Sequence, residues 1–98
     1  MKWCNVMRDK SLKSSDFDAL FELIASLKTA DECRELFSDL CTNKEIEQMA
    51  QRIGAAKLLL EGKTYQQVTD TFDISSATLS RVSRCVKYSS GYNKFLKG

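Results

Sequence analysis

A segment near the end of the chain combines residue types suited to contact with a polyanion. Between Ile74 and Tyr88 it carries Arg81, Arg84 and Lys87 and no acidic residue. Such cations bind phosphate oxygens, and an arginine also reads the edge of a guanine base. The small or hydroxyl-bearing residues beside them are Ser75, Ser76, Ala77, Thr78, Ser80 and Ser83. Small side chains let a helix approach base edges closely, so the segment predicts contact with double-stranded DNA.

A helix-turn-helix over residues 64–87 would present this segment to DNA. It requires a short helix, a turn of three or four residues and a second helix that enters the major groove. Thr64 and Gln67 have the spacing of a capping box at the start of the first helix, and we expect both to lie at the DNA. Ser75 or Ser76 caps the second helix. The apolar residues expected to set the angle between the helices are Val68, Phe72, Ile74, Leu79 and Val82.

The alternative is that these are two amphipathic helices of an ordinary bundle. Serine and threonine are mediocre helix formers, and a solvent face would be better served by Glu, Lys and Ala. This favours DNA binding over the bundle. Asp70 lies on the first helix and would be repelled by phosphate. With the modest net charge of +2, it motivates a second alternative, a helical protein-interaction module without specific DNA recognition.

Three further helices are expected over residues 15–61, where apolar residues recur at spacings of three and four. The first begins near Ser15, and capping boxes at Thr29–Glu32 and Thr42–Glu45 begin the others. Their apolar residues are Phe17, Leu20, Phe21, Ile24 and Leu27, then Cys33, Leu36, Phe37 and Leu40, then Ile46, Met49, Ala50, Ile53, Ala56 and Leu60. We expect this region to supply the core and a dimer interface.

The third helix ends in Leu58, Leu59 and Leu60, which makes its end apolar nearly all round and predicts burial on several sides. Gly62 then ends the helix. Residues 1–13 are expected to form a loose arm that docks through Trp3. The tail from residue 92 to residue 96 is expected to be one docked turn or a frayed end.

The amino-acid composition of the chain indicates its fold class. The chain has 98 residues, no proline and four glycines, which favours a single all-α domain. Residues 1–56 carry 8 basic and 10 acidic side chains, and residues 57–98 carry 7 basic and 3 acidic ones. The second region is therefore the basic one, as expected of a segment that binds a polyanion.

The residue types of the chain do not indicate a metal site or a catalytic site. The cysteines at positions 4, 33, 41 and 85 form no C-x-x-C pair, and the chain has no histidine, so core packing is preferred over a metal or redox site. Without histidine, general acid–base catalysis would need a carboxylate or a lysine, and no nucleophile–base pair is evident. No membrane span or signal peptide is visible, and we expect a cytoplasmic protein that is not an enzyme and has no cofactor.

The segments LCTNKEIEQMAQRIGAAKLLLEGKTYQQVT and ISSATLSRVSRCVK, within residues 40–87, resemble the Trp repressor superfamily. The similarity is greatest to its TrpR-like YerC/YecD family. The resemblance implies an all-α, intertwined homodimer that binds operator DNA and represses transcription, with the helix from Ser76 in the major groove. It also implies a corepressor between the long helix and the recognition helix, at positions matched here by Thr42, Arg52 and Arg81.

Two positions depart from that family's pattern. Val82 follows Arg81 directly, where the motif has glycine, and Cys85 replaces a serine. A valine fills space that a ligand ring would need, which weakens the case for tryptophan binding and leaves a small-molecule corepressor open. The other interpretation of Arg52 is a salt bridge to Glu45 or to a partner chain.

Overall fold

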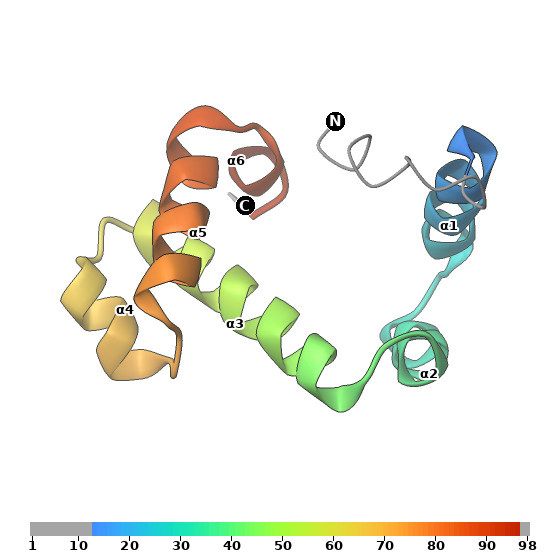
Figure 1. Cartoon of the computed structure of the whole chain (residues 1–98), viewed down its shortest axis with the longest axis horizontal. Coiled ribbons are helices and arrows are strands. Elements are labelled where there is room, and N and C mark those ends of the chain that lie inside the picture. The colour runs from blue at the N-terminus through green and yellow to red at the C-terminus, as the bar shows by residue number, and fades with distance from the viewer. Residues whose placement is uncertain (1–12, 97–98) are drawn as a thin grey trace. The chain divides into compact units, whose positions relative to one another are not determined.

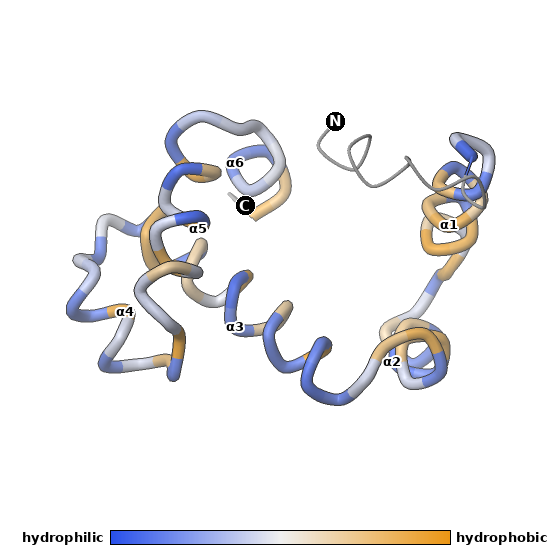
Figure 2. The backbone as a smooth tube through the Cα atoms, viewed as in Figure 1, coloured by the Kyte–Doolittle hydropathy of each residue, from blue (hydrophilic) through white to orange (hydrophobic). Residues whose placement is uncertain are grey.

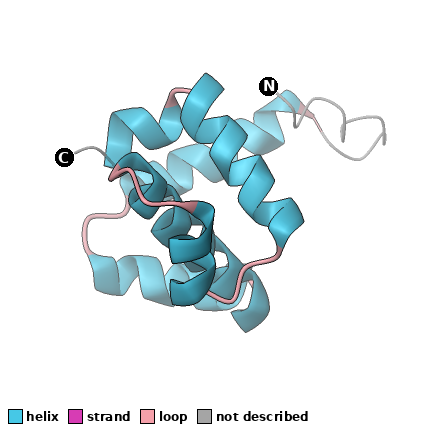
Figure 3. Cartoon of the chain, turned by 90° about the vertical axis from the view of Figure 1, so that its left-hand side faces the viewer, coloured by secondary structure: helices cyan, strands magenta, loops and turns pink. Residues whose placement is uncertain are grey.

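The computed structural model describes residues 13–96, which form six α-helices joined by short loops (Figure 1, Figure 3). The all-α prediction is therefore confirmed. The chain divides into two compact units, Met1–Leu40 and Cys41–Gly98. The expected arm, apart from Lys13, lies outside the described residues, and so does Trp3.

The first unit contains α1 (Ser14–Ser26) and α2 (Ala30–Leu40). Asp16 begins α1 by accepting the backbone N–H of Lys13 on Oδ2 at 3.0 Å. At α2, the Thr29 hydroxyl accepts the N–H of Glu32 at 3.1 Å, as expected of a capping box. The returning hydrogen bond differs from the expected one, because Glu32 accepts the N–H of Lys28 at 2.7 Å rather than that of Thr29.

The apolar stripes of α1 and α2 are not buried among the residues that the structure describes in the first unit. Neither helix has a buried residue, and Figure 2 shows hydrophobic stretches along both. Phe21 is 51% exposed and Leu23 49%. Cys33, expected in a core, is exposed, so that prediction is wrong for the single chain. The helices are amphipathic as predicted, but their apolar faces need a further surface to be buried.

The second unit contains α3 (Asn43–Leu60), α4 (Tyr65–Thr71), α5 (Ser76–Tyr88) and α6 (Gly91–Leu96). Thr42 caps α3 and Thr64 caps α4, each through a capping box as predicted. Gly62 follows α3 with a φ of 89°, the left-handed conformation that glycine adopts without strain. The N–H groups of Gly62 and Lys63 donate to the carbonyls of Leu59 and Leu58, which closes the helix.

The core of this unit lies where α5 crosses α3 (Figure 1). Ala55 and Ala56 of α3 are fully buried, and their small side chains let α5 approach closely. The other buried apolar residues are Val68, Leu79 and Val82, with Phe72 and Ile74 packed against them. These are the five residues expected to hold the helix-turn-helix together.

In the second unit, burial predictions are wrong at three positions: Ala50, Ile53 and Ser83, of which Ala50, expected on the inner stripe of α3, is exposed. Ile53, expected on the inner stripe of α3, is 46% exposed, while Ala55, not included in that stripe, is buried. Ser83, expected on the outer face of the second helix, is only 5% exposed. Ser83 lies four residues after Leu79, and side chains at that spacing share one face of a helix. It therefore points inward with Leu79.

The tail over residues 92–96 lies in a docked helix, α6, rather than in a frayed end. Tyr92 and Leu96 of α6 pack against the core, and α6 contacts both α3 and α5. Among the residues described, no helix is long and apolar enough to cross a membrane.

Candidate nucleic-acid interface

The first turn of α5 is organised by Ser75. Its hydroxyl accepts the N–H of Thr78 at 3.2 Å and donates to the Thr78 hydroxyl at 3.0 Å. Ser75 is thus the cap, and Ser76 is the first residue of the helix. Thr78 is half-buried, whereas Ser75, Ser76 and Ala77 are exposed, and of these Ser75 already uses its hydroxyl in the cap.

One face of α5 is exposed and cationic. The predicted DNA-binding residues that lie exposed on this helix are Ser76, Ala77, Ser80, Arg81, Arg84 and Lys87. Leu79, Val82 and Ser83 point inward. The helix contains no acidic residue. The ion pairs of the described residues, Arg34–Asp31 and Lys44–Glu47, leave all three cations of α5 without a carboxylate partner. Their charge is available to a polyanion.

The predicted contacts on α4 are exposed and already serve the helix cap. Gln67 Oε1 accepts the N–H of Thr64 at 2.8 Å, and the Thr64 hydroxyl accepts the N–H of Gln67 at 3.2 Å. Asp70 is exposed on the same helix and accepts a hydrogen bond from Gln66 Nε2 at 2.9 Å. The amide partner leaves the negative charge of Asp70 in place, so α4 is less suited to phosphate than α5.

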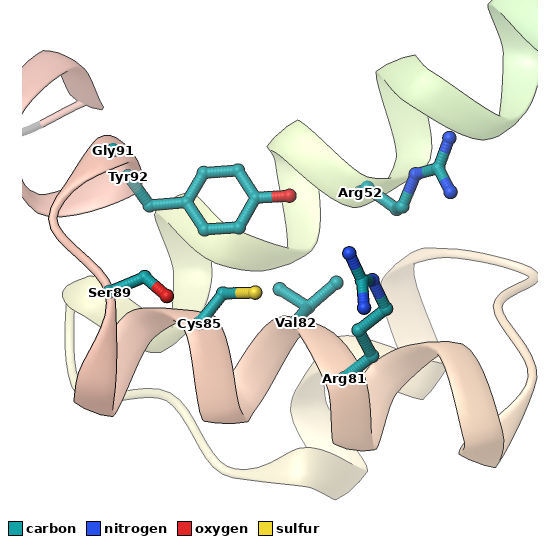
Figure 4. Close-up of a pocket in the computed structure, with 7 residues that line it drawn as sticks. All are labelled: Arg52, Arg81, Val82, Cys85, Ser89, Gly91 and Tyr92. Carbon is teal, nitrogen blue, oxygen red and sulfur yellow. The ribbon is translucent and has the colours of Figure 1, made fainter. Parts of the chain in front are cut away.

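A hollow of about 490 Å³ lies between α3, α5 and the start of α6 (Figure 4). Arg52 from α3 and Arg81 from α5 line it together, as the two arginines of the predicted ligand site should. Thr42, the third residue of that prediction, is not part of its lining. Its hydroxyl accepts the N–H of Glu45 at 3.1 Å, at the start of α3. The geometry therefore assembles two of the three predicted ligand residues.

Side chains of the protein itself project into this hollow. Figure 4 shows Val82 and Cys85 pointing from α5 toward the ring of Tyr92, which comes from α6. The expectation that Val82 occupies space beside Arg81 agrees with this arrangement. Tyr92 was missed from the sequence, because only the docking of α6 brings it to the long helix.

The salt bridge considered for Arg52 is not formed with Glu45. The Glu45 carboxylate accepts the N–H of Thr42 at 2.8 Å instead. Hydrogen bonds from the backbone and then the hydroxyl of Thr42 lower the pKa of Glu45 below its usual 4.5, against a small opposing effect of desolvation. Arg52 also borders a second, polar hollow of about 360 Å³, with Lys44, Gln48 and the start of α5. Within the described residues it has no ion-pair partner.

Comparison with known proteins identifies the family of this chain. The family model described as Trp repressor protein matches residues 15–98. The chain belongs to the Trp repressor protein family. It is 44% identical over 82 residues to the uncharacterized protein YerC of Bacillus subtilis (strain 168), covering 84% of this chain and 79% of YerC. The predicted resemblance to the YerC group is thus confirmed.

Solved structures agree with the Trp repressor fold. A Trp repressor candidate from Staphylococcus aureus has a TM-score of 0.82 at 35% identity, covering 92% of this chain and 91% of that one. A TrpR-like protein from Eubacterium eligens has a TM-score of 0.82 at 38% identity, covering 91% of this chain and 93% of that one. The Trp repressor-like fold is that of a family of regulators.

In this member of the Trp repressor family, one further residue extends the exposed face of α5. Tyr88 follows Arg84 by four residues and is 83% exposed. An exposed tyrosine offers a hydroxyl to phosphate and a ring to sugar. Its spacing from Arg84 is the signal in the sequence that could have identified it.

Proposed function

We propose that this chain is a sequence-specific DNA-binding transcriptional regulator, a repressor, and that it acts as a homodimer. The observation that carries the proposal is the exposed face of α5. It combines small side chains in the first turn with Arg81, Arg84 and Lys87, and it has no acidic residue. Small residues permit close approach to base edges, and the cations bind the flanking phosphates.

Membership of the Trp repressor family supports the proposal, because the fold is that of DNA-binding regulators. The dimer is supported by the first unit. Neither of its helices has a buried residue, and Phe21, Leu23 and Leu40 are each about half exposed. An exposed apolar surface of this kind is buried when two copies associate. Two recognition helices would then read major grooves about 34–36 Å apart, one turn of DNA.

A small-molecule effector is not part of the proposal. Arg52 and Arg81 could hold an anionic group, but Val82, Cys85 and Tyr92 project into the same hollow (Figure 4). Nor is catalysis part of it, since no nucleophile–base pair stands out in the sequence.

The test measures binding of the purified protein to genomic fragments over a series of salt concentrations. Lys87→Ala is compared with Lys57→Ala, because both lysines are exposed in the last turn of their helices but only Lys87 belongs to the cationic face of α5. We expect Lys87→Ala to lower the slope of log affinity against log salt by about 1. Lys57→Ala should leave the slope unchanged.

Arg84→Ala tests base recognition in the same assay. If Arg84 reaches a base edge, its loss costs about 1–3 kcal/mol of binding free energy and relaxes specificity at one position. Failure of the wild-type protein to select any fragment over random DNA would exclude the regulator. It would favour the interaction module, for which the exposed carboxylate of Asp70 is the supporting feature.

The dimer has its own test. Sedimentation at micromolar concentration should show a dimer, and Leu23→Glu should shift it toward monomer because a buried charge without a partner is costly. A monomeric wild type would contradict the homodimer.

A further inference from the structure

Helix α6 supports the recognition helix. At the level of the backbone, α5 packs chiefly against α3 and α6, whereas α4 packs chiefly against α3. Tyr92 and Leu96 of α6 reach the core, and Figure 4 shows Tyr92 above Val82 and Cys85 of α5. The direction of α5 is therefore set at least as much by α6 as by its partner in the helix-turn-helix.

A single side chain joins these two helices by hydrogen bonds. Asn93 Nδ2 donates to the carbonyl oxygen of Val86 at 2.6 Å and to that of Ser89 at 3.2 Å. In the described part of the second unit, the bond to Val86 is the one side-chain hydrogen bond that links one helix to another. Asn93 is half-buried, so water competes less for this contact than at an open surface.

The contact meets a need of the last turn of α5. The final carbonyls of a helix lack N–H donors within the helix. The carbonyl oxygen of Cys85 accepts the backbone N–H of Ser89 at 2.9 Å, and the side-chain amide of Asn93 donates to the carbonyl oxygen of Val86. An amide has two N–H groups, so one asparagine can serve both Val86 and Ser89. A carboxylate in the same place would offer no donor and would face two carbonyl oxygens.

Among the residues described, no side-chain hydrogen bond attaches the N-terminal end of α5 to another helix. Ser75 and Thr78 bond to each other within the same turn, which caps the helix but does not attach it to α3. Packing alone thus holds the end that carries Ser76 and Ala77, and hydrogen bonds fix the other end. A change of tilt at the fixed end moves the whole outward face, including Arg81 and Arg84.

We propose that Asn93 is a positioning residue for DNA recognition, which holds the C-terminal end of α5 and so sets the direction in which its exposed face meets DNA. This proposal rests on the proposed function, because the direction of α5 affects specificity only if the protein binds DNA. Asn93 touches no base or phosphate in this role. It acts on specificity through the helix.

The experiment compares Asn93→Asp with Asn43→Asp. Asn43 is exposed at the first position of α3, so both variants add the same charge to the second unit. Three quantities are measured: the ratio of affinity for a selected fragment to that for random DNA, hydrogen exchange of the Ser89 amide, and the free energy of unfolding. The ratio removes any uniform effect of the added charge.

We expect Asn93→Asp to lower the affinity ratio by up to about tenfold, because the two lost hydrogen bonds no longer hold the tilt of α5, and to speed exchange at Ser89. Asn43→Asp should change neither. Asn93→Ala, which adds no charge, should lower the ratio in the same direction and replaces Asn93→Asp if that variant does not fold.

An unchanged ratio in a folded Asn93 variant would overturn the proposal, and so would unchanged exchange at Ser89. If the wild-type protein selects no DNA fragment over random DNA, that result is already visible before any variant is compared. That result would remove the proposed function and, with it, the DNA role of Asn93. The two failures are therefore distinguishable.

Discussion

The ring of Phe72 lies against the bare backbone of Gly54. A Cβ atom added at Gly54 would sit 2.3 Å from Cζ of Phe72, far inside van der Waals contact. Phe72 ends α4, and Gly54 lies in the middle of α3. The absence of a side chain at position 54 thus determines how closely the first helix of the helix-turn-helix is seated on the long helix.

Gly54→Ala should destabilise the protein, although alanine is the better helix former. The gain in helix propensity is about 1 kcal/mol, and forcing a rigid ring out of a packed site costs about 1–3 kcal/mol. We expect a net loss of up to about 2 kcal/mol in the free energy of unfolding. Denaturant unfolding measures it, with Gly91→Ala as the control, because a Cβ at Gly91 meets no atom within 4 Å.

Phe72→Leu provides the second arm of a double-mutant cycle. In its presence, Gly54→Ala should cost clearly less, because the smaller side chain can move away. Additive effects of the two substitutions, or a stabilising Gly54→Ala, would show that the ring and the glycine are not coupled.

Ser83→Ala should stabilise the protein. The Ser83 side chain is buried, and its hydroxyl has no hydrogen-bond partner in the described chain. A buried unsatisfied group costs about 1–3 kcal/mol, so removing it should raise the melting temperature by about 4–8 °C, the shift that corresponds to 1 kcal/mol in a domain of this size. DNA affinity should not change, because Ser83 faces inward.

Ser80→Ala is the matched control for Ser83→Ala. Ser80 is exposed on the outward face of the same helix. Its loss should weaken DNA binding with little effect on the melting temperature, measured at one protein concentration. The reverse pattern for the two serines would contradict the assignment of the outward face.

The contribution of Glu45 to stability should depend on pH. Hydrogen bonds from Thr42 lower its pKa in the folded protein below the usual 4.5. A group of this kind stabilises the fold above its unfolded pKa, and the contribution is lost as the pH falls through the lower, folded pKa. The difference in stability between wild type and Glu45→Gln should therefore shrink when the pH is lowered from 6 through this range. A difference that stays constant in urea unfolding over the same range would refute this origin.

Added L-tryptophan should leave DNA affinity unchanged. A ligand coupled to DNA binding shifts affinity by roughly five- to 150-fold, which a titration detects easily. Val82, Cys85 and Tyr92 project into the hollow beside Arg52 and Arg81, so we expect no such shift. A shift in that range would show that these side chains move aside and that the hollow takes a ligand.

Much of the fold followed from local patterns. The capping boxes at Thr42 and Thr64 begin α3 and α4 as predicted, because the cap and its partner are only three residues apart. Gly62 ends α3 for an equally local reason, its positive φ. The exposed cations of α5 could be predicted too, since charged side chains seldom leave water.

Other features depend on contacts between distant residues and were not predictable from spacing. Ser83 looked like a surface residue by type, but the crossing of α5 over α3 encloses it. The resemblance grouped Thr42 with Arg52 and Arg81, whereas both arginines line the hollow and Thr42 does not. Tyr92 and Asn93 acquire their roles only because α6 folds back onto α5.

The sequence by itself determined the helices, their ends and the basic face of residues 76–88, because these depend on the chemistry of neighbours within one or two turns. The tertiary structure decided which side of α3, α4 and α5 is buried, how the ring of Phe72 packs on Gly54, and how Asn93 holds the end of α5. Those outcomes depend on close packing between different helices, for which spacing along the chain carries no signal.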